Sequence, residues 1–333
     1  MPEPPGAVPA LRGILETSVY VNDLAASPID DLKEQIEDGI VLLPDDPRYD
    51  EARTIWNAMI DRRPAVIVRC QSEKDVMRAV AFARANEIPL SVRGGGHNIA
   101  GHAVCDDGVM VDLSRMNFVH VDPAAQRASV GPGALLSDFD KAAQKDGLAT
   151  PLGINSTTGV AGLTLGGGFG WLTRKYGLTV DNLLAARVVM ADGELMRASE
   201  QDSPDLFWAL RGGGGNFGVV TQFEFALHPV GPNVLAGLMV FSGLEAEQVL
   251  RNYRQYIASA PDELSVWAVL RGAPPLPFLP PEVHGQLVFN LMAGYARRLP
   301  SPHCEIFLGQ LGGQAARVAP EATAFGNRDA NFV

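Results

Sequence analysis

The sequence predicts an α+β protein in two parts, and three observations support this prediction. Residues 65–92 contain a strand, a helix and a second strand in close succession, which is the order of a βαβ unit. Short strand-like runs separated by turn residues continue as far as Pro229. Beyond Pro229 the expected strands are longer and mixed with helix, which is typical of an antiparallel sheet with helical cover. We therefore place a domain boundary between residues 229 and 235.

The composition restricts the class of protein. The chain has 333 residues, of which 47% are hydrophobic and 20% are charged, a mixture typical of globular domains. Its net charge is −11 and it has no run rich in Lys or Arg, so the electrostatic signature of a nucleic-acid-binding protein is missing. We expect no nucleic-acid partner. Backbone N–H groups would have to hold any anionic ligand.

The cysteines and the N-terminus indicate the compartment. Cys70, Cys105 and Cys304 are too few and too unevenly spaced for a disulfide framework, which favours a reducing compartment. The first 20 residues lack a basic stretch followed by an apolar one, and no run approaches 18 apolar residues. We therefore expect no signal peptide and no membrane span, and a cytoplasmic protein.

The first elements lead into the βαβ unit. Residues 1–40 form an N-terminal segment that contains one amphipathic stretch. A turn at 44–47 precedes a short helix expected near 49–60. The βαβ unit itself combines strands at 65–69 and 88–92 with a helix that Ser72 can cap, since Glu73 and Asp75 follow in its first turn.

The other expected elements are described by their ranges. Up to residue 229 we expect strands at 108–113, 117–121, 126–131 and 217–227, a helix at 135–145, a hairpin of 183–190 with 194–198 around Asp192-Gly193, and a helix at 204–210 with Ser203 as its N-cap. After the boundary we expect strands at 235–241, 264–270 and 286–292 and a helix at 244–258.

Three glycine clusters contain the chemical signal. The first is Arg93-Gly94-Gly95-Gly96-His97-Asn98, directly after a strand; the second spans residues 158–170; the third spans 211–221 and leads into a strand. Consecutive glycines leave several N–H groups free to bind a phosphate. One cluster alone can be a tight turn, but three beside strong elements favour a ligand site.

The two common nucleotide sites do not fit these clusters. A Rossmann site needs Gly-x-Gly-x-x-Gly between a strand and a helix, with an acidic residue about 20 positions later. Residues 93–98 do not open a convincing helix, and the spacing differs. A P-loop needs a Gly-Lys-Ser/Thr ending, which the clusters lack.

The ordered motifs resemble a known family. They are Val92-Arg93-Gly94-Gly95-Gly96-His97-Asn98, then Gly159-Val160-Ala161-Gly162 running into Leu165-Gly166-Gly167-Gly168-Phe169-Gly170-Trp171, then Leu206-Phe207-Trp208-Ala209-Leu210-Arg211-Gly212-Gly213-Gly214-Gly215-Asn216-Phe217-Gly218. Together they resemble the p-cresol-methylhydroxylase-type FAD-binding fold of berberine-bridge-like oxidases, over residues 42–229. The resemblance implies an FAD-binding domain of two α/β subdomains at 41–229 and a substrate domain at 235–333.

The resemblance also assigns roles to residues. It implies that Arg93, Gly94, Gly95, Gly96 and Asn98 form the pyrophosphate loop and that His97 attaches to the 8α-methyl carbon of the flavin. It also implies that the isoalloxazine and ribityl are lined by Thr158, Gly159, Gly162, Gly166, Gly167 and Gly168. The adenine side is implied to contact the backbone of Gly218, Val219 and Val220. Asn155 stands where some members have a second attaching cysteine, so a single link is expected.

Other interpretations of these residues remain. His97 can be an ordinary loop residue, or a metal ligand with His102 and Cys105, although a fourth ligand with sensible spacing is missing. We therefore expect no metal site. Arg174 and Tyr176 can lie near the flavin or be exposed, and Trp171 and Trp208 are expected to be packing residues.

The implied function is that of an FAD-dependent oxidase. It would pass a hydride from an alcohol, a sugar or another small organic substrate to covalent flavin, with dioxygen as acceptor. No Tyr-x-Asn motif follows residue 230, whereas active members carry one near the C-terminus. A segment also looks absent near residues 296–303, so the substrate domain is expected to be shortened. We assign no catalytic base, and a truncated or non-catalytic flavin-binding protein is the alternative.

Overall fold

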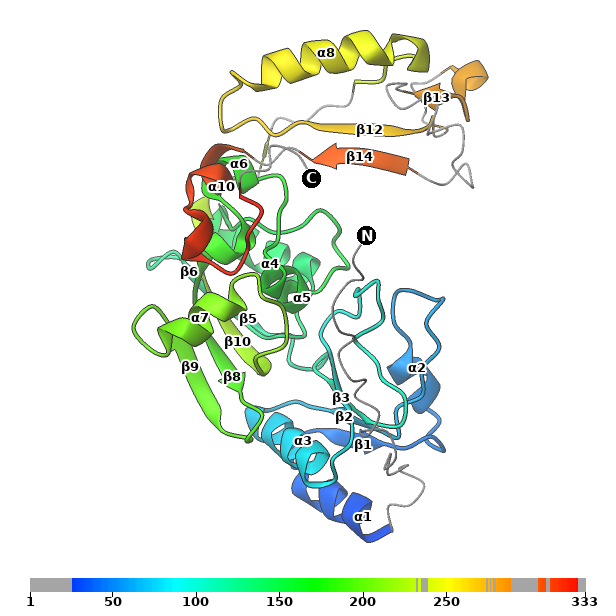
Figure 1. The fold of residues 1–333 in the computed structure, drawn as a ribbon, viewed down its shortest axis with the longest axis vertical. Coiled ribbons are helices and arrows are strands. Elements are labelled where there is room, and N and C mark those ends of the chain that lie inside the picture. Colours follow the sequence, from blue (N-terminus) through cyan, green and yellow to red (C-terminus); the bar gives the residue numbers. More distant parts are fainter. Residues whose placement is uncertain are drawn as a thin grey trace, which may run out of the picture.

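The computed structural model describes residues 26–231, 233–234, 239–273, 275, 277, 280–288, 305–309 and 312–328. Two large sheets, with a small two-stranded pair of residues 148–149 and 228–229, build the chain up to residue 229. A third, three-stranded sheet lies at the far end of the molecule (Figure 1). Helices and sheets are mixed, as predicted. The boundary at 229–235 and the domain ranges remain predictions.

The first subdomain is a four-stranded sheet with helices. Its elements are α1 (Ala26–Gln35), β1 (Ile40–Leu42), α2 (Tyr49–Arg53), β2 (Val66–Arg69), α3 (Glu73–Ala85), β3 (Leu90–Arg93) and β4 (Val109–Asp112). The strand order is β1-β2-β4-β3, with β2 and β3 both parallel to β4 and β1 antiparallel to β2. The predicted βαβ unit is therefore confirmed, and β4 lies between its two strands.

A capping box fixes the start of α3. Ser72 Oγ accepts from the backbone N–H of Asp75 at 3.3 Å, and the Asp75 carboxylate accepts from the N–H groups of Ser72 and Gln71 at 3.2 and 3.0 Å. Asp75 is fully buried and also accepts from the Glu37 N–H at 3.2 Å. The predicted cap is confirmed, and its carboxylate also joins the end of α1 to α3.

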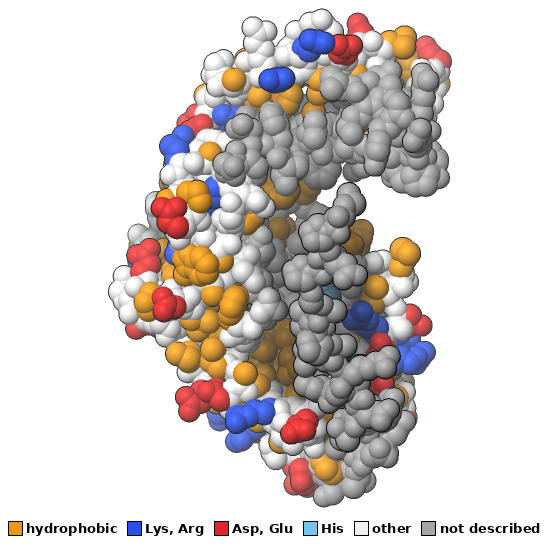
Figure 2. Space-filling view, viewed as in Figure 1, with side chains coloured by type: hydrophobic (Ala, Val, Ile, Leu, Met, Phe, Trp, Pro, Cys, Tyr) orange, Lys and Arg blue, Asp and Glu red, His pale blue; other side chains and the backbone are white. Residues whose placement is uncertain are grey.

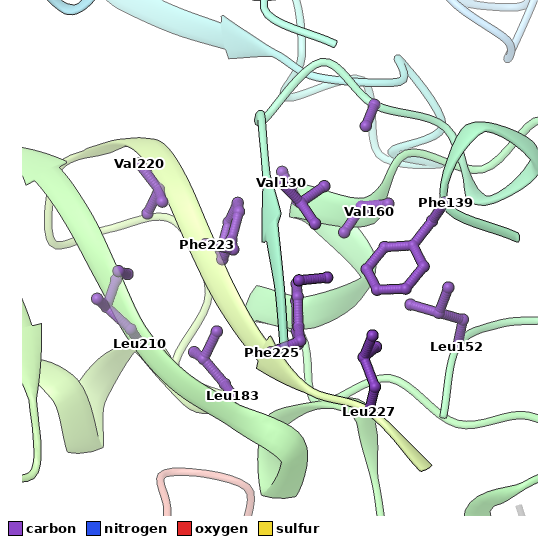
Figure 3. Close-up of a cluster of buried hydrophobic side chains, with 14 of the residues drawn as sticks. Val130, Phe139, Leu152, Val160, Leu183, Leu210, Val220, Phe223, Phe225 and Leu227 are labelled. Atoms are coloured by element: carbon purple, nitrogen blue, oxygen red, sulfur yellow. The ribbon is translucent and has the colours of Figure 1, made fainter. Parts of the chain in front are cut away.

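The second subdomain holds a five-stranded antiparallel sheet of order β5-β6-β10-β8-β9. Its elements are β5 (Val119–Asp122), β6 (Arg127–Val130), α4 (Leu136–Ala143), β7 (Leu148–Ala149), α5 (Val160–Leu165), α6 (Thr173–Tyr176), β8 (Leu183–Val189), β9 (Leu195–Ser199), α7 (Pro204–Leu210), β10 (Val219–Ala226) and β11 (His228–Pro229). In its core Phe139 of α4 meets Phe225 of β10 edge-on, with ring centroids 5.7 Å apart (Figure 3).

Two expectations in this subdomain need correction. Residues 160–165 form α5, a helix that the small-residue pattern did not predict. The helix after Ser203 begins at Pro204 as predicted, but Ser203 makes no side-chain cap. Its φ of 48° lies in the left-handed region, whereas an N-cap residue normally adopts extended backbone.

The third sheet has the order β13-β12-β14 and is antiparallel. It comprises β12 (Trp267–Gly272), β13 (Leu287–Val288) and β14 (Glu305–Gly309), and α8 (Ala246–Ile257) runs along one side of it (Figure 1). The predicted helix at 244–258 is confirmed. In the strand expected at 235–241, residues 239–241 are not strand, and residues 235–238 lie outside the described residues. In the strand expected at 286–292, residues 289–292 also lie outside the described residues.

The chain then returns to the second subdomain through α10 (Gly313–Arg317), which lies beside α6 (Figure 1). Short 3₁₀ helices occupy Gln144–Asp146, Thr179–Asn182, Gly243–Glu245, Pro281–Val283 and Pro320–Ala322.

Among the described residues, no helix combines the length and apolar character needed to cross a bilayer. On the face shown in Figure 2, the described basic side chains lie among acidic ones and form no broad positive patch.

Candidate functional site

The first and second glycine clusters contact each other through their backbones. The first cluster follows β3, and a Cβ added to Gly95 would lie 2.4 Å from the Gly159 nitrogen. A Cβ on Gly159 would lie 2.5 Å from the Gly95 nitrogen, and one on Gly94 would lie 2.9 Å from the Pro132 carbonyl oxygen. No side chain fits between the two segments, so glycine is required on both sides of this contact.

The backbone N–H groups of the first cluster are available to a ligand. Within the described part of the chain, none of the N–H groups of residues 94–98 donates a hydrogen bond to the protein. The carbonyls are used instead: Gly96 accepts from the Trp56 N–H and Asn98 from the Gly101 N–H, each at 3.1 Å. Gly96 is buried, Gly94, Gly95 and His97 are half-buried, and Asn98 is exposed. A run of unpaired N–H groups of this kind suits an anion such as a diphosphate.

Arg93 adds a positive charge beside these N–H groups. Its Nη1 donates to the Ala52 carbonyl at 2.6 Å and lies 4.0 Å from the Asp112 carboxylate. Asp112 is fully buried and forms a closer ion pair with Arg69, whose Nε lies 2.7 Å from the carboxylate. The Arg93 Nε is buried and has no acceptor among the described residues. A buried donor without an acceptor fits a site that takes a polar ligand.

His97 is held between an aromatic ring and the second cluster. Its imidazole stacks on Trp56, with ring centroids 5.2 Å apart and an interplanar angle of 22°. The backbone of Thr157, just before the second cluster, lies near the ring. Burial lowers the pKa of His97 below its usual 6.5, and the Thr157 backbone opposes this shift. The imidazole is therefore neutral at pH 7, and one ring nitrogen keeps its lone pair.

Sequence reasoning missed Trp56. It lies after α2, far from the glycine loops along the chain, and its side chain is 60% exposed. Its neighbours show no motif that could relate it to His97. The signal exists only in the fold, because the hydrogen bond from the Trp56 N–H to the Gly96 carbonyl brings the two rings together.

The second cluster surrounds α5 and has one open side. A Cβ on Gly162, inside α5, would meet nothing within 4 Å. Gly167 and Gly168 have φ of 105° and 72°, and a Cβ on either would collide with the Phe325 ring or with Thr179, respectively. Space for a ligand therefore lies beside Gly162, whereas Gly167 and Gly168 are packed against protein.

The third cluster joins the second through one backbone hydrogen bond. The Gly214 N–H donates to the Leu165 carbonyl at 2.9 Å. At the other end of the cluster Gly218 has a φ of 140° and would hold a Cβ 2.6 Å from the Val189 oxygen. Val219 and Val220 begin β10 and their side chains are buried in the core. Only their backbones are left for a ligand.

An ion pair joins the two subdomains close to this strand. Arg187 of β8 forms two hydrogen bonds with the Glu73 carboxylate of α3, at 2.7 and 2.6 Å. Thr221 of β10 donates to the same carboxylate at 2.8 Å. The carboxylate raises the pKa of Arg187, and the bidentate pair fixes α3 against the second sheet.

Arg174 lies against the loop that precedes β12, and Tyr176 lies against β11. Arg174 is buried, donates to the Leu264 and Ala260 carbonyls at 3.1 Å each, and lies 3.5 Å from Asp262. Tyr176 stacks on His228, with ring centroids 3.9 Å apart. Both side chains therefore pack against other parts of the chain.

The remaining candidates are also accounted for. Trp171 stacks on Trp267 at 4.4 Å and Trp208 donates to the Glu321 carbonyl at 2.8 Å, in agreement with packing roles.

Burial raises the pKa of the Cys70 and Cys105 thiols, which makes them less reactive. Among the described residues no three His, Cys, Asp or Glu side chains gather as a metal site. Cys304 lies outside the described residues.

Comparison with known proteins agrees with this geometry. Residues 64–199 match a family model described as an FAD binding domain. The chain is 44% identical to (R)-6-hydroxynicotine oxidase of Paenarthrobacter nicotinovorans over 204 residues, which is 61% of this chain and 44% of that protein. It is 37% identical to an FAD-linked oxidoreductase of Dictyostelium discoideum over 244 residues, covering 72% of this chain and 53% of the relative. The chain thus spans about half the length of these relatives.

Solved structures give the same result. A crystal structure of 6-hydroxy-D-nicotine oxidase from Arthrobacter nicotinovorans matches with a TM-score of 0.69 and 34% identity, over 89% of this chain and 60% of that one. A glucose oxidase variant of Phl p 4 matches with a TM-score of 0.68 and 31% identity, over 74% and 53% of the two chains. The chain therefore belongs to the FAD-linked oxidoreductases that carry an FAD-binding domain of the p-cresol-methylhydroxylase type.

Proposed function

We propose that this chain binds FAD covalently through His97 and forms the flavin-binding part of an oxidase of small organic molecules. The observation that carries the proposal is the position of His97. Its neutral imidazole is held between Trp56 and the Thr157 backbone, beside the contact of Gly95 with Gly159. A ring nitrogen with a free lone pair thus lies beside the contact of the two glycine segments and next to the N–H groups of residues 94–98, which are unpaired within the described chain.

The surrounding residues would hold the cofactor. The N–H groups of residues 94–98 and the Arg93 Nε would bind the diphosphate, because they are donors without protein acceptors among the described residues. Thr158, Gly159, Gly162 and residues 166–168 would lie along the isoalloxazine and ribityl, with Gly162 on the open side. The backbone of Gly218, Val219 and Val220 would face the adenine.

The chemistry divides between cofactor and protein. Bound FAD supplies hydride acceptance from an alcohol, sugar or other small organic substrate, with dioxygen as the proposed final acceptor. His97 would bond through its lone-pair nitrogen to the 8α-methyl carbon. One methyl C–H proton and the imidazole N–H proton would be released, and with the two electrons they would reduce dioxygen to hydrogen peroxide. The names of the relatives, a hydroxynicotine oxidase and a glucose oxidase variant, support an oxidase and leave the substrate class broad.

Acid precipitation tests the cofactor and its link together. Purified protein is precipitated with acid, and flavin fluorescence is measured in the pellet and in the supernatant. We expect fluorescence in the wild-type pellet and none in that of His97→Ala, whose flavin moves to the supernatant because the glycine loops are intact. His102→Ala is the matched control from the same loop and should keep its pellet fluorescence. Acid-stable flavin in His97→Ala would refute the assignment.

A non-catalytic flavin-binding protein is the second candidate. Anaerobic mixing with alcohols and sugars separates the two candidates. An oxidase loses the flavin absorbance on mixing and regains it when air is admitted, whereas a binding protein keeps its absorbance throughout.

A further inference from the structure

The last described part of the chain, Gly312–Arg328, returns from the third sheet to the glycine clusters, and we call it the strap. It begins against α6, where a Cβ on Gly313 would lie 2.3 Å from the Arg174 carbonyl oxygen. It continues past α7, where Trp208 Nε1 donates to the Glu321 carbonyl and Arg211 Nη2 to the Ala322 carbonyl, at 2.8 and 2.9 Å. Figure 1 shows it in red beside α6 and α7. The strap therefore lies along the elements on either side of the second and third clusters.

Phe325 of the strap fills the space between two of these glycines. A Cβ on Gly167 would lie 2.5 Å from the Phe325 ring, and one on Gly212 would lie 2.6 Å from the Phe325 nitrogen. Both glycines have φ above 100°, a conformation that L side chains rarely adopt. Phe325 thus packs directly on the left-handed turns that shape both clusters.

Arg328 acts on the same turns through Asp181. Its guanidinium donates to both Asp181 oxygens at 2.9 and 2.6 Å, and it is 3% exposed. Asp181 in turn accepts from the Leu178 N–H at 2.8 Å, which fixes the turn at 179–182. From this turn the Thr179 and Val180 N–H groups donate to the Gly168 and Gly167 carbonyls at 2.9 and 3.1 Å.

We propose that Phe325 and Arg328 are positioning residues for the flavin. By fixing the turns at Gly167, Gly168 and Gly212, they hold the second and third clusters in the shape that receives the isoalloxazine. The proposal rests on the proposed FAD site and adds a dependence of that site on a segment well beyond the FAD-binding domain match at residues 64–199.

Two strap variants and two controls test this with purified full-length chain. Phe325→Ala removes the packing and Arg328→Met removes the ion pair. Arg328→Lys keeps a charge, and Arg317→Met changes a half-exposed strap arginine that pairs with Asp262. Because a covalent link would hide any change in affinity, FAD affinity is measured with each substitution placed in the His97→Ala background. The circular dichroism of the bound flavin is recorded on the same proteins, far below the melting temperature. We expect Phe325→Ala and Arg328→Met to weaken FAD binding about tenfold or more and to alter the circular dichroism of the flavin. Arg317→Met should bind FAD as the unsubstituted strap does. The affinity of Arg328→Lys should lie between those of Arg328→Met and the unsubstituted strap.

A second measurement needs no flavin. Hydrogen exchange of the amides at 166–168 and 211–215 is compared between wild-type apoprotein and Arg328→Met, and faster exchange there is expected in the variant. Unchanged exchange together with unchanged flavin binding in folded variants would overturn the positioning role. Wild-type protein that binds no FAD would instead refute the proposed function, and the exchange experiment would still decide the role of the strap.

Discussion

The second glycine cluster makes two contacts of different kinds. With the first cluster it meets backbone to backbone, at Gly95 and Gly159, and no side chain intervenes. With the third cluster it shares one backbone hydrogen bond, from Gly214 to Leu165, and a side chain, Phe325, which arrives from the far end of the described chain. The first contact depends only on glycine at fixed positions, so a sequence motif can reveal it. The second depends on a distant residue, and no local pattern contains that information.

The backbone contact can be broken most directly at Gly95. In Gly95→Ala the new Cβ would lie 2.4 Å from the Gly159 nitrogen, and neither backbone can move away without separating the clusters. We expect the free energy of unfolding to fall by about 3 kcal/mol and FAD binding to be lost, as measured by urea unfolding and cofactor titration. Gly215→Ala, whose Cβ would meet nothing within 4 Å, is the control. Wild-type FAD affinity in Gly95→Ala would contradict the assignment of this contact to the site.

The open space beside the contact can be probed at Gly162. In Gly162→Ala the methyl group enters empty space within a helix, so the apoprotein should gain about 0.5 kcal/mol from helix propensity. If the cofactor lies over α5, the same methyl should weaken FAD binding about tenfold. Thermal melts of the apoprotein and FAD titrations measure the two opposite effects. A variant that is more stable and binds FAD unchanged would place the cofactor elsewhere.

The side chain beside the backbone contact is tested at Trp56. Trp56→Ala removes the ring that orients His97 while leaving the glycine loops intact, and Trp56→Phe keeps an aromatic ring as control. We expect the rate at which apoprotein forms acid-stable flavin to fall about tenfold in the alanine variant, because the imidazole loses its fixed orientation. Non-covalent binding should be nearly unchanged. Equal rates in all three proteins would show that the stack with Trp56 is not needed.

The smallest effect is expected from pH. Burial lowers the pKa of His97 below 6.5. At pH 6.5 the imidazole is therefore mostly neutral in the folded protein, whereas about half of it is protonated in the unfolded chain. The rate of acid-stable flavin formation should therefore be more than half of its plateau value at pH 6.5, and its midpoint should lie below pH 6.5. In that lower window the unfolded state binds more protons than the folded one, so His97 lowers stability as the pH falls. A rate already halved at pH 6.5 would indicate an unshifted imidazole.

Much of the flavin domain could be predicted because its signals are local. The β-branched run before Arg69 and the Ser72–Asp75 capping box define β2 and α3 within a few residues. The glycine clusters predicted that their segments share a site, and the Gly95–Gly159 contact agrees. Helix α5 was missed because Val160–Leu165 is rich in small residues and lacks an amphipathic period.

The residues that the sequence did not indicate act over long distances. Trp56 meets His97 only because of how α2 and β3 are placed, and Phe325 and Arg328 meet their partners only after the chain has passed through the third sheet. Ser203 was misassigned because its left-handed backbone is set by the preceding turn rather than by its own preference for capping.

The position of the strap also sets an order for biosynthesis. The ribosome releases the three glycine clusters well before residue 328, yet the turns at Gly167 and Gly212 have their packing partner only when Phe325 has emerged. Cofactor capture would then follow translation of the third sheet. A cell short of flavin would accumulate chains that are fully synthesised and not yet loaded, which makes riboflavin supply during expression a determinant of the yield of yellow protein.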